Sequence, residues 1–176
     1  MIQHSSDAEM ATIMRVAQAM CAAARTAPKT RGIDYIDTCI VTGDEKDALA
    51  GAMDRLYERY SAEGFKRDAQ NIRDSQAVVL IGTQYHQRGL DERCQLCNFK
   101  NCADSRDAGA VCVFDPMDLG ISLGSAVAMA ADMRVDNRIM YTAGKGALEL
   151  NMMGENIKNI IGIPLSVTGK SPFFDR

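Results

Sequence analysis

Four of the six cysteines are concentrated in one polar segment in the middle of the chain. They are spaced C-x2-C-x4-C-x9-C and are Cys94, Cys97, Cys102 and Cys112. Two cysteines separated by two residues can point both sulfurs at one centre through a tight turn, and two more nearby complete a four-thiolate shell. Zn²⁺ and iron–sulfur clusters both accept this ligand set. The spacing therefore predicts a cysteine-ligated metal site.

The spacing leaves the identity of the metal open. Structural zinc sites usually consist of two C-x2-4-C pairs separated by a longer stretch, whereas here three cysteines fall within nine residues. This compact arrangement favours an iron–sulfur cluster, for example of the 4Fe-4S type. Zinc is one alternative, and reduced thiols without metal are another. Cys21 and Cys39 lie in a predicted helix and strand, and we interpret them as small buried hydrophobic residues.

A second group of residues with chemical potential is basic. Arg25, Lys29 and Arg31 place three cations within seven residues between a predicted helix and a predicted strand, and no carboxylate occurs among them before Asp34. Phosphate favours such a cluster, and arginine can bind it with two parallel hydrogen bonds. The alternative is a solvated basic turn without a ligand.

Other kinds of chemistry find little support. The two histidines are His4 and His86, and no G-x-S-x-G, P-loop or H-E-x-x-H pattern occurs. The net charge of −3 and the interspersed charges argue against a nucleic-acid partner. Neither a membrane span nor a signal peptide is recognisable. We therefore expect a cytoplasmic protein whose thiols are kept reduced.

Hydrophobic periodicity predicts the elements that position these residues. Asp115-Pro116 is typical of an N-cap followed by proline at the first helical position, and the helix that follows extends through Ala130. Gly120 and Gly124 are costly inside that helix, which suggests that something packs close to its backbone. The other predicted helices span 7–26, 44–62, 67–74 and 147–161, and the predicted strands span 33–41, 77–82, 138–142 and 163–167.

Helices and strands alternate along the chain, which is typical of an α/β or α+β protein. Residues 84–114 interrupt this order, because they are polar and have neither helical nor strand periodicity. No repeat or linker divides the chain. We expect one domain over residues 1–176 with a cysteine-rich insertion over 84–114.

Two motifs carry a resemblance to a known family. The segment Ala22-Ala23-Ala24-Arg25-Thr26-Ala27-Pro28, which ends a predicted helix, resembles the A-A-R-x-A-P-S turn of the nitroreductase family. The segment from Ile157 to Pro164, followed by a strand and Gly169-Lys170, is similar to that family's closing helix, G-x-P turn and final strand. With the cysteine loop added, the chain resembles an uncharacterised prokaryotic family that contains a ferredoxin domain and has a nitroreductase-like fold.

The resemblance implies an α+β fold with a mixed central sheet flanked by helices, and a homodimer that binds FMN at the subunit interface. It assigns the contacts with the flavin or its ribityl-phosphate to the turn Pro28, Lys29, Thr30 and Arg31. Lys170 and Ser171 would take the place of a phosphate-binding basic residue. Gly144, Lys145 and Gly146, placed after the strand predicted over 138–142, would approach the flavin through backbone N–H groups.

The sequence departs from the nitroreductase pattern in two places. The family's R-R-S-x-R phosphate clamp has no counterpart, and Lys29-Thr30-Arg31-Gly32 replaces the usual S-x-x-N. The resulting hypothesis is an FMN-dependent oxidoreductase in which an iron–sulfur cluster passes single electrons. The alternatives are a zinc-binding or iron–sulfur-binding module and an electron carrier without flavin. The sequence names neither the electron donor nor the acceptor.

Overall fold

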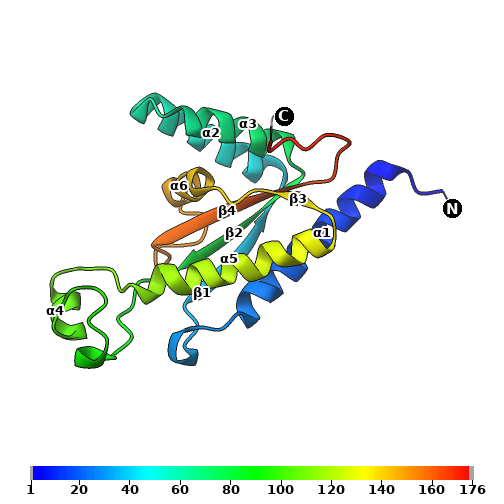
Figure 1. Cartoon of the computed structure of the whole chain (residues 1–176). Helices are drawn as coiled ribbons and strands as arrows, with labels where there is room; N and C mark the ends of the chain where they lie inside the picture. Colours follow the sequence, from blue (N-terminus) through cyan, green and yellow to red (C-terminus); the bar gives the residue numbers. More distant parts are fainter. Residues whose placement is uncertain (1, 175–176) are drawn as a thin grey trace.

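A computed structural model describes residues 2–174. It contains a four-stranded sheet between two layers of helices (Figure 1). The strands are β1 (Ile36–Val41), β2 (Ala77–Thr83), β3 (Asp136–Asn137) and β4 (Asn159–Ser166). The helices are α1 (Ser5–Thr26), α2 (Gly43–Tyr60), α3 (Glu63–Asp74), α4 (Cys102–Asp107), α5 (Phe114–Asp132) and α6 (Tyr141–Glu149), with 3-10 turns η1 (Thr30–Gly32) and η2 (Asp91–Arg93).

The sheet has the strand order β1-β2-β4-β3. Each neighbouring pair is antiparallel, with Ile36 opposite Thr83, Ala77 opposite Leu165 and Asp136 opposite Ser166. The predicted α+β class is therefore confirmed, but the predicted mixed sheet is wrong. β2 lies in the centre and is buried along its whole length, which explains its run of apolar residues.

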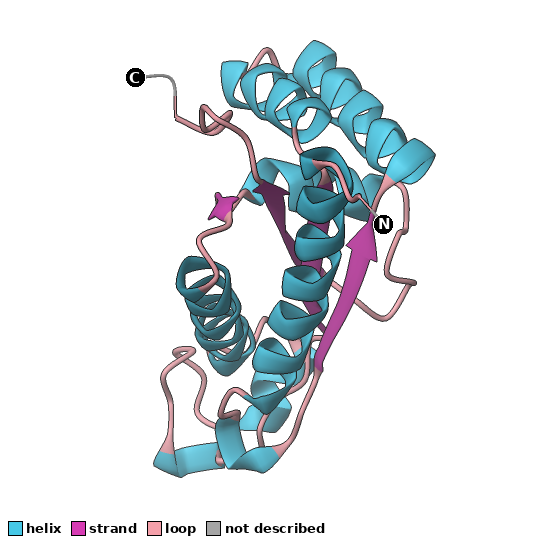
Figure 2. Cartoon of the chain, turned by 90° about the vertical axis from the view of Figure 1, so that its right-hand side faces the viewer, coloured by secondary structure: helices cyan, strands magenta, loops and turns pink. Residues whose placement is uncertain are grey.

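One face of the sheet is covered by α1 and α5 and the other by α2, α3 and α6 (Figures 1 and 2). Side chains of β2 alternate between the two sides, so that Val79 and Ile81 join one core while Val78 and Leu80 join the other. The first core is completed from the helices by Ile13, Val16, Met20, Leu119, Leu123 and Ala126. The second is completed by Leu49, Met53, Leu56, Ile72, Ala143 and Ala147.

The elements near the N-terminus agree with the sequence prediction to within a few residues. The first strand is shorter than the predicted range 33–41, because residues 30–32 form a 3-10 turn and β1 starts at Ile36. The second helix is predicted to extend to residue 62. Instead, α2 ends at Tyr60 with Ser61 in the left-handed conformation, and Gly64 lies inside α3.

The elements near the C-terminus differ more. The strand predicted over 138–142 is wrong, since β3 covers only Asp136–Asn137 and α6 begins at Tyr141. The helix predicted over 147–161 is also wrong, because α6 ends at Glu149 and β4 starts at Asn159. The segment expected to form a closing helix and a G-x-P turn therefore lies mostly inside the central sheet.

The two glycines inside α5 have open space around them. A Cβ added at Gly120 or Gly124 would meet nothing within 4 Å. The close packing expected at these glycines is therefore not found within residues 2–174. Over the same residues, no helix is both long enough and apolar enough to cross a membrane.

Candidate functional site

The cysteine-rich segment forms a loop between β2 and α5, at the lower left of Figure 1. All four of its cysteines line one small cavity of about 20 Å³. Cys112 is buried, whereas Cys94, Cys97 and Cys102 are half-buried, and all four are free thiols. The fold thus brings together the four side chains that the spacing selected.

The backbone of the loop turns sharply after each cysteine of the C-x2-C pair. Gln95 follows Cys94 with φ 53°, and Asn98 follows Cys97 with φ 64°, so both residues are left-handed. Residues other than glycine adopt this conformation at a cost of roughly 1 kcal/mol or more, and such strain is concentrated at functional sites. Each of the two turns thus directly follows a cysteine that lines the cavity.

The third cysteine begins the short helix α4. The Asn101 side chain caps this helix by accepting a hydrogen bond from Asp104 N at 2.9 Å. The backbone N–H of Cys102 donates to Asp91 Oδ1 at 3.2 Å, which ties α4 to η2. Capping interactions of this kind stabilise short helices by about 1 kcal/mol. Cys102 is therefore held by polar contacts of the loop itself.

The four thiols share a cavity but are not arranged as a coordination shell. Among residues 2–174, no group of three or more His, Cys, Asp or Glu side chains is positioned to hold a metal ion. A cavity of about 20 Å³ accommodates roughly one water molecule. A single Zn²⁺ therefore requires the thiol side chains to rotate inward, and a larger iron–sulfur cluster requires the loop to expand. The donor set itself fits either group.

The basic turn after α1 is occupied by internal contacts. Lys29 Nζ donates to Ala24 O and to Arg25 O, both at 2.6 Å, and its side chain is only 4% exposed. Burial lowers the pKa of Lys29. These contacts satisfy carbonyl groups at the C-terminal end of α1, where cations are favourable. Lys29 thus stabilises the end of the helix, and Pro28 is exposed beside it.

The other basic residues of the turn also bind the protein. Arg25 Nη1 donates to Ile36 O at 2.6 Å and lies 3.3 Å from Asp34 Oδ2. Arg31, left-handed with φ 62°, donates from Nη1 to Arg88 O at 2.6 Å. The basic residues of the turn therefore all make contacts within the protein, while Arg25 and Arg31 remain exposed.

Thr30 leads from the turn to a buried group of charges. Its backbone N–H lies 3.1 and 3.2 Å from the two carboxylate oxygens of Asp118, and its hydroxyl donates to Oδ1 at 2.9 Å. Asp118 accepts a further bond from Arg88 Nη2 at 3.1 Å. Arg88 Nη1 in turn lies 2.8 Å from Asp115 Oδ1. We call Arg88, Asp115 and Asp118 the charge clamp.

The charge clamp joins the two ends of the cysteine loop. Arg88 follows β2, whereas Asp115 and Asp118 belong to the first turns of α5, and all three side chains are 2% exposed or less. His86 N donates to Asp115 Oδ2 at 3.1 Å. The Arg88 guanidinium also lies 4.7 Å from the centre of the Tyr35 ring, which stacks on His86 at 4.2 Å. The loop and the basic turn are thus fastened at one place.

The role predicted for Asp115 is wrong. Asp115 was expected to cap α5, but α5 already begins at Phe114 and its N-cap is Val113 without a side-chain bond. The Asp115 carboxyl is instead buried, and burial raises its pKa although Arg88 and the His86 N–H act in the opposite direction. The signal for the clamp was the presence of two acidic residues three positions apart on the apolar face of the helix.

The tripeptide predicted to approach the flavin through its backbone lies inside α6. A Cβ added at Gly144 would come within 1.7 Å of Ile160 O, and one at Gly146 within 2.9 Å of Met53 Cγ. Both glycines are buried and allow α6 to pack against β4 and α2, while Lys145 between them is half-buried. The predicted position after a strand is wrong, and the glycines serve close packing here.

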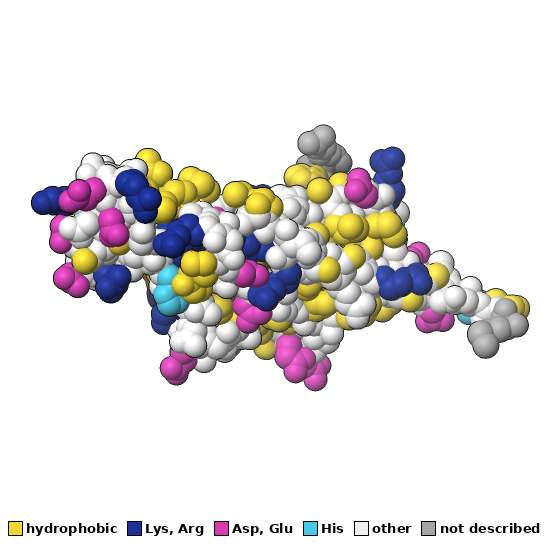
Figure 3. All heavy atoms as spheres, turned by 90° about the horizontal axis from the view of Figure 1, so that it is seen from below, with side chains coloured by type: hydrophobic (Ala, Val, Ile, Leu, Met, Phe, Trp, Pro, Cys, Tyr) yellow, Lys and Arg dark blue, Asp and Glu magenta, His cyan; other side chains and the backbone are white. Residues whose placement is uncertain are grey.

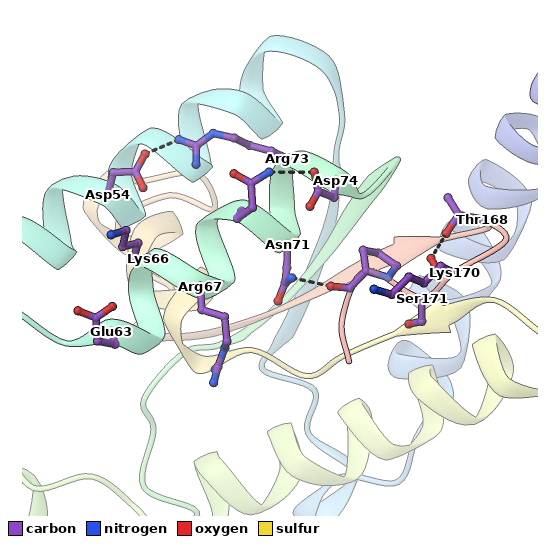
Figure 4. A pocket seen from close by; sticks show the side chains of 12 residues that line it. Asp54, Glu63, Lys66, Arg67, Asn71, Arg73, Asp74, Thr168, Lys170 and Ser171 are labelled. Atoms are coloured by element: carbon purple, nitrogen blue, oxygen red, sulfur yellow. Dashed lines mark hydrogen bonds and ion pairs between the residues drawn. The ribbon is translucent and has the colours of Figure 1, made fainter. Parts of the chain in front are cut away.

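Lys170 and Ser171 lie at the opposite end of the sheet from the basic turn. Together with α3 they line a polar cleft of about 980 Å³ (Figure 4). Asn71 Nδ2 donates to Pro172 O at 2.6 Å and Thr168 Oγ1 to Lys170 O at 2.6 Å. The structure therefore does not bring Lys170 and Ser171 together with residues 28–31 within one chain.

Cys21 and Cys39 lie outside the loop. Both are half-buried, and Cys21 packs against one core while Cys39 packs against the other. Burial raises the pKa of both thiols, that of Cys39 to about 11. These features agree with their interpretation as small hydrophobic residues.

Solved structures with a similar fold are nitroreductases and related flavin-using enzymes. Nitroreductase CinD from Lactococcus lactis in complex with nicotinic acid matches with a TM-score of 0.61 and 13% identity, over 99% of this chain and 86% of that chain. A protein assigned as a nitroreductase from Desulfovibrio desulfuricans, in complex with FMN, matches with a TM-score of 0.61 and 12% identity, over 92% and 78%. The chain therefore has the nitroreductase fold.

The sequence comparisons are more specific. An uncharacterized protein from Archaeoglobus fulgidus is 38% identical over an alignment of 184 residues. The alignment covers 100% of this chain and 98% of that protein. Residues 108–176 match the model of the family described as "Uncharacterized protein containing a ferredoxin domain (DUF2148)". The chain belongs to this family, as its resemblance predicted. The matched segment includes Cys112 and begins after the other three cysteines of the loop.

Proposed function

We propose that this protein is an FMN-dependent oxidoreductase whose cysteine loop holds a metal centre, either an iron–sulfur cluster or zinc. The observation that carries the metal part is that four cysteines from a polar loop line one cavity. The flavin part is supported by the fold, because a nitroreductase-fold protein of similar size is in complex with FMN. When bound, FMN would supply hydride chemistry and an iron–sulfur cluster would supply single-electron transfer, whereas zinc would have a structural role without redox chemistry.

The chain's own residues have separate tasks in this proposal. Cys94, Cys97, Cys102 and Cys112 would bind the metal, and the charge clamp would fix their loop against the sheet. Arg25 and Arg31, whose positions are exposed, would face the flavin at the basic turn. Lys170 and Ser171 would bind the phosphate of the flavin. The half-buried Lys145 would contribute only its positive charge to flavin binding.

The distribution of these residues over two ends of the sheet favours a homodimer. One flavin can contact both the basic turn and Lys170 only if the two come from different copies of the chain. Apolar side chains on the surface of α5 provide material for such an interface, since Met117 is 45% and Ile121 40% exposed beside Gly120. We therefore place the proposed flavin between two copies.

A second function is favoured by the contacts of the basic turn. Lys29, Thr30 and Arg31 already use donor groups on carbonyl and carboxylate groups of the protein. A protein in which the turn keeps these contacts would be a metal-binding module or an electron carrier without flavin. In that case the fold would serve only to present the cysteine loop.

One substitution separates these functions, and a second tests the metal site that they share. Lys170→Ala should weaken FMN binding by about tenfold if Lys170 contacts the phosphate, while Lys158→Ala, in an exposed lysine elsewhere, should not. Cys97→Ser should remove iron or zinc in both functions. FMN affinity is measured by fluorescence quenching, and the metal by elemental analysis. Wild-type protein that binds metal but no FMN would establish the module, and metal retained in Cys97→Ser would refute the site.

A further inference from the structure

Ser105 is a buried hydroxyl group beside the cysteine cavity. It lies on α4, three residues after Cys102, so that both side chains belong to the same face of one helical turn. Its side chain is completely buried, although the surrounding loop is polar. Cys97 Sγ and Ser105 Oγ are 3.8 Å apart and form a hydrogen bond. α4 thus presents one candidate ligand and one hydroxyl group toward the cysteines.

The position of Ser105 is fixed by its backbone. Ser105 N donates to Asn101 O at 3.3 Å, and Ala110 N donates to Ser105 O at 2.9 Å. The hydroxyl can therefore not move far from Cys97. Ser122 on α5 provides a contrast, because it is equally buried but its Oγ has no hydrogen-bond partner among residues 2–174. Ser105 is not simply a small residue tolerated in the interior.

The direction of the Ser105–Cys97 bond depends on the state of the sulfur. As a thiol, Cys97 donates its S–H to the hydroxyl oxygen. A cysteine that binds a metal does so as a thiolate and has no S–H to donate. A serine hydroxyl carries both a donor and acceptor sites, so it can rotate and donate to the sulfur instead.

We propose that Ser105 is a positioning residue of the metal site, whose hydroxyl donates a hydrogen bond to the metal-bound Cys97 sulfur. This inference rests on the proposed four-cysteine site and adds a residue that does not touch the metal. A donor behind a ligand fixes its orientation and stabilises its charge, and loss of such a partner typically weakens metal binding about 10- to 100-fold.

The test compares the full-length wild-type protein with Ser105→Ala, Ser105→Thr and Ser122→Ala. Zn²⁺ affinity is measured by competition with a chelator, and Co²⁺ is added as a spectroscopic probe. Ser105→Ala should bind Zn²⁺ about tenfold more weakly, the lower end of the range for lost partners. Its thiolate-to-cobalt charge-transfer band should move to lower energy, because the sulfur loses a hydrogen bond. Ser105→Thr, which retains a hydroxyl, and Ser122→Ala should both resemble the wild type.

The possible failures can be told apart. Equal Zn²⁺ affinity and an unshifted cobalt band in Ser105→Ala would overturn the role of Ser105 while leaving the metal site intact. An equal loss of affinity in Ser105→Ala and Ser122→Ala would mean that packing alone is responsible, and would also overturn it. A wild-type protein that binds neither Zn²⁺ nor Co²⁺ and contains no iron after anaerobic purification would refute the four-cysteine site itself, and the inference with it.

Discussion

Arg88, Asp115 and Asp118 place one positive and two negative charges in the interior beside the cysteine loop. Removing charges from water costs several kcal/mol per ion, and only close partners offset this cost. Asp118 has such partners, because Thr30 and Arg88 both donate to it. Asp115 is less well compensated, since burial outweighs the effect of Arg88 on its pKa. The clamp thus fixes the position of the loop, and burying Asp115 costs more stability than burying Asp118.

Replacing the arginine of the clamp should be severely destabilising. Arg88→Met leaves two buried carboxylates without their cation, so the free energy of unfolding should fall by about 3–5 kcal/mol. Arg59→Met is the matched control, because Arg59 pairs with Glu149 on the surface, so its replacement should change the free energy of unfolding very little. Urea denaturation measures both. A loss of under 1 kcal/mol in Arg88→Met would contradict the clamp.

Asp115 should make stability depend on pH in a defined direction. Its pKa is raised in the folded protein, so the folded state holds the proton over a pH range in which the unfolded chain releases it. Stability from Asp115 is therefore fully present below the ordinary carboxyl range and is lost as the pH rises through the folded pKa. As the pH rises above about 4, the free energy of unfolding of Asp115→Asn should increase relative to that of the wild type. A constant difference over that range would refute this assignment.

At the scale of the elements, the sequence predicted what periodicity determines. The helix over 7–26 and the strand over 77–82 appear as α1 and β2, because an uninterrupted apolar pattern fixes each. The prediction failed near α6 and β4, because packing between elements determines the secondary structure there. Gly144 and Gly146 resemble loop residues, yet Gly144 lets α6 approach β4 and Gly146 lets it approach α2, and Gly162 in β4 lies against Ala143. Likewise, spacing identified the four cysteines, but the clamp required knowledge of which charges are buried.

The contact between α6 and β4 predicts a strong effect of one methyl group. Gly144→Ala would place a Cβ against the backbone of Ile160, so it should destabilise the protein by several kcal/mol, about 3 or more. Gly51→Ala in α2 is the control, because its Cβ would meet only Arg55 Nη1 at 3.8 Å. That change should stabilise by about 0.5–1 kcal/mol. Thermal unfolding distinguishes them, and equal effects would disprove the close packing.

At the scale of the whole molecule, the two ends of the sheet carry different chemistry. The basic turn and the cysteine loop lie together at one end, whereas the cleft with Lys170 lies at the other (Figures 1 and 4). On the face drawn in Figure 3, acidic and basic side chains are interspersed with hydrophobic ones. No large basic surface dominates that face.

The separation of the two ends predicts the state of assembly. If each flavin is shared between two copies, light scattering should give twice the chain mass of 19.2 kDa, and FMN should bind with one flavin per chain. Dilution that dissociates the dimer should release FMN in parallel. A monomer of 19.2 kDa that retains one FMN would contradict the shared site.

The central claim is that one protein combines a flavin with a cysteine-bound metal. The most direct measurement is the visible absorption spectrum of protein purified without oxygen, with flavin and metal content determined on the same sample. We predict the two-banded spectrum of bound FMN together with iron, seen as a broad brown shoulder, or with zinc. A colourless protein without FMN would contradict the oxidoreductase, and a protein free of both iron and zinc would contradict the metal centre.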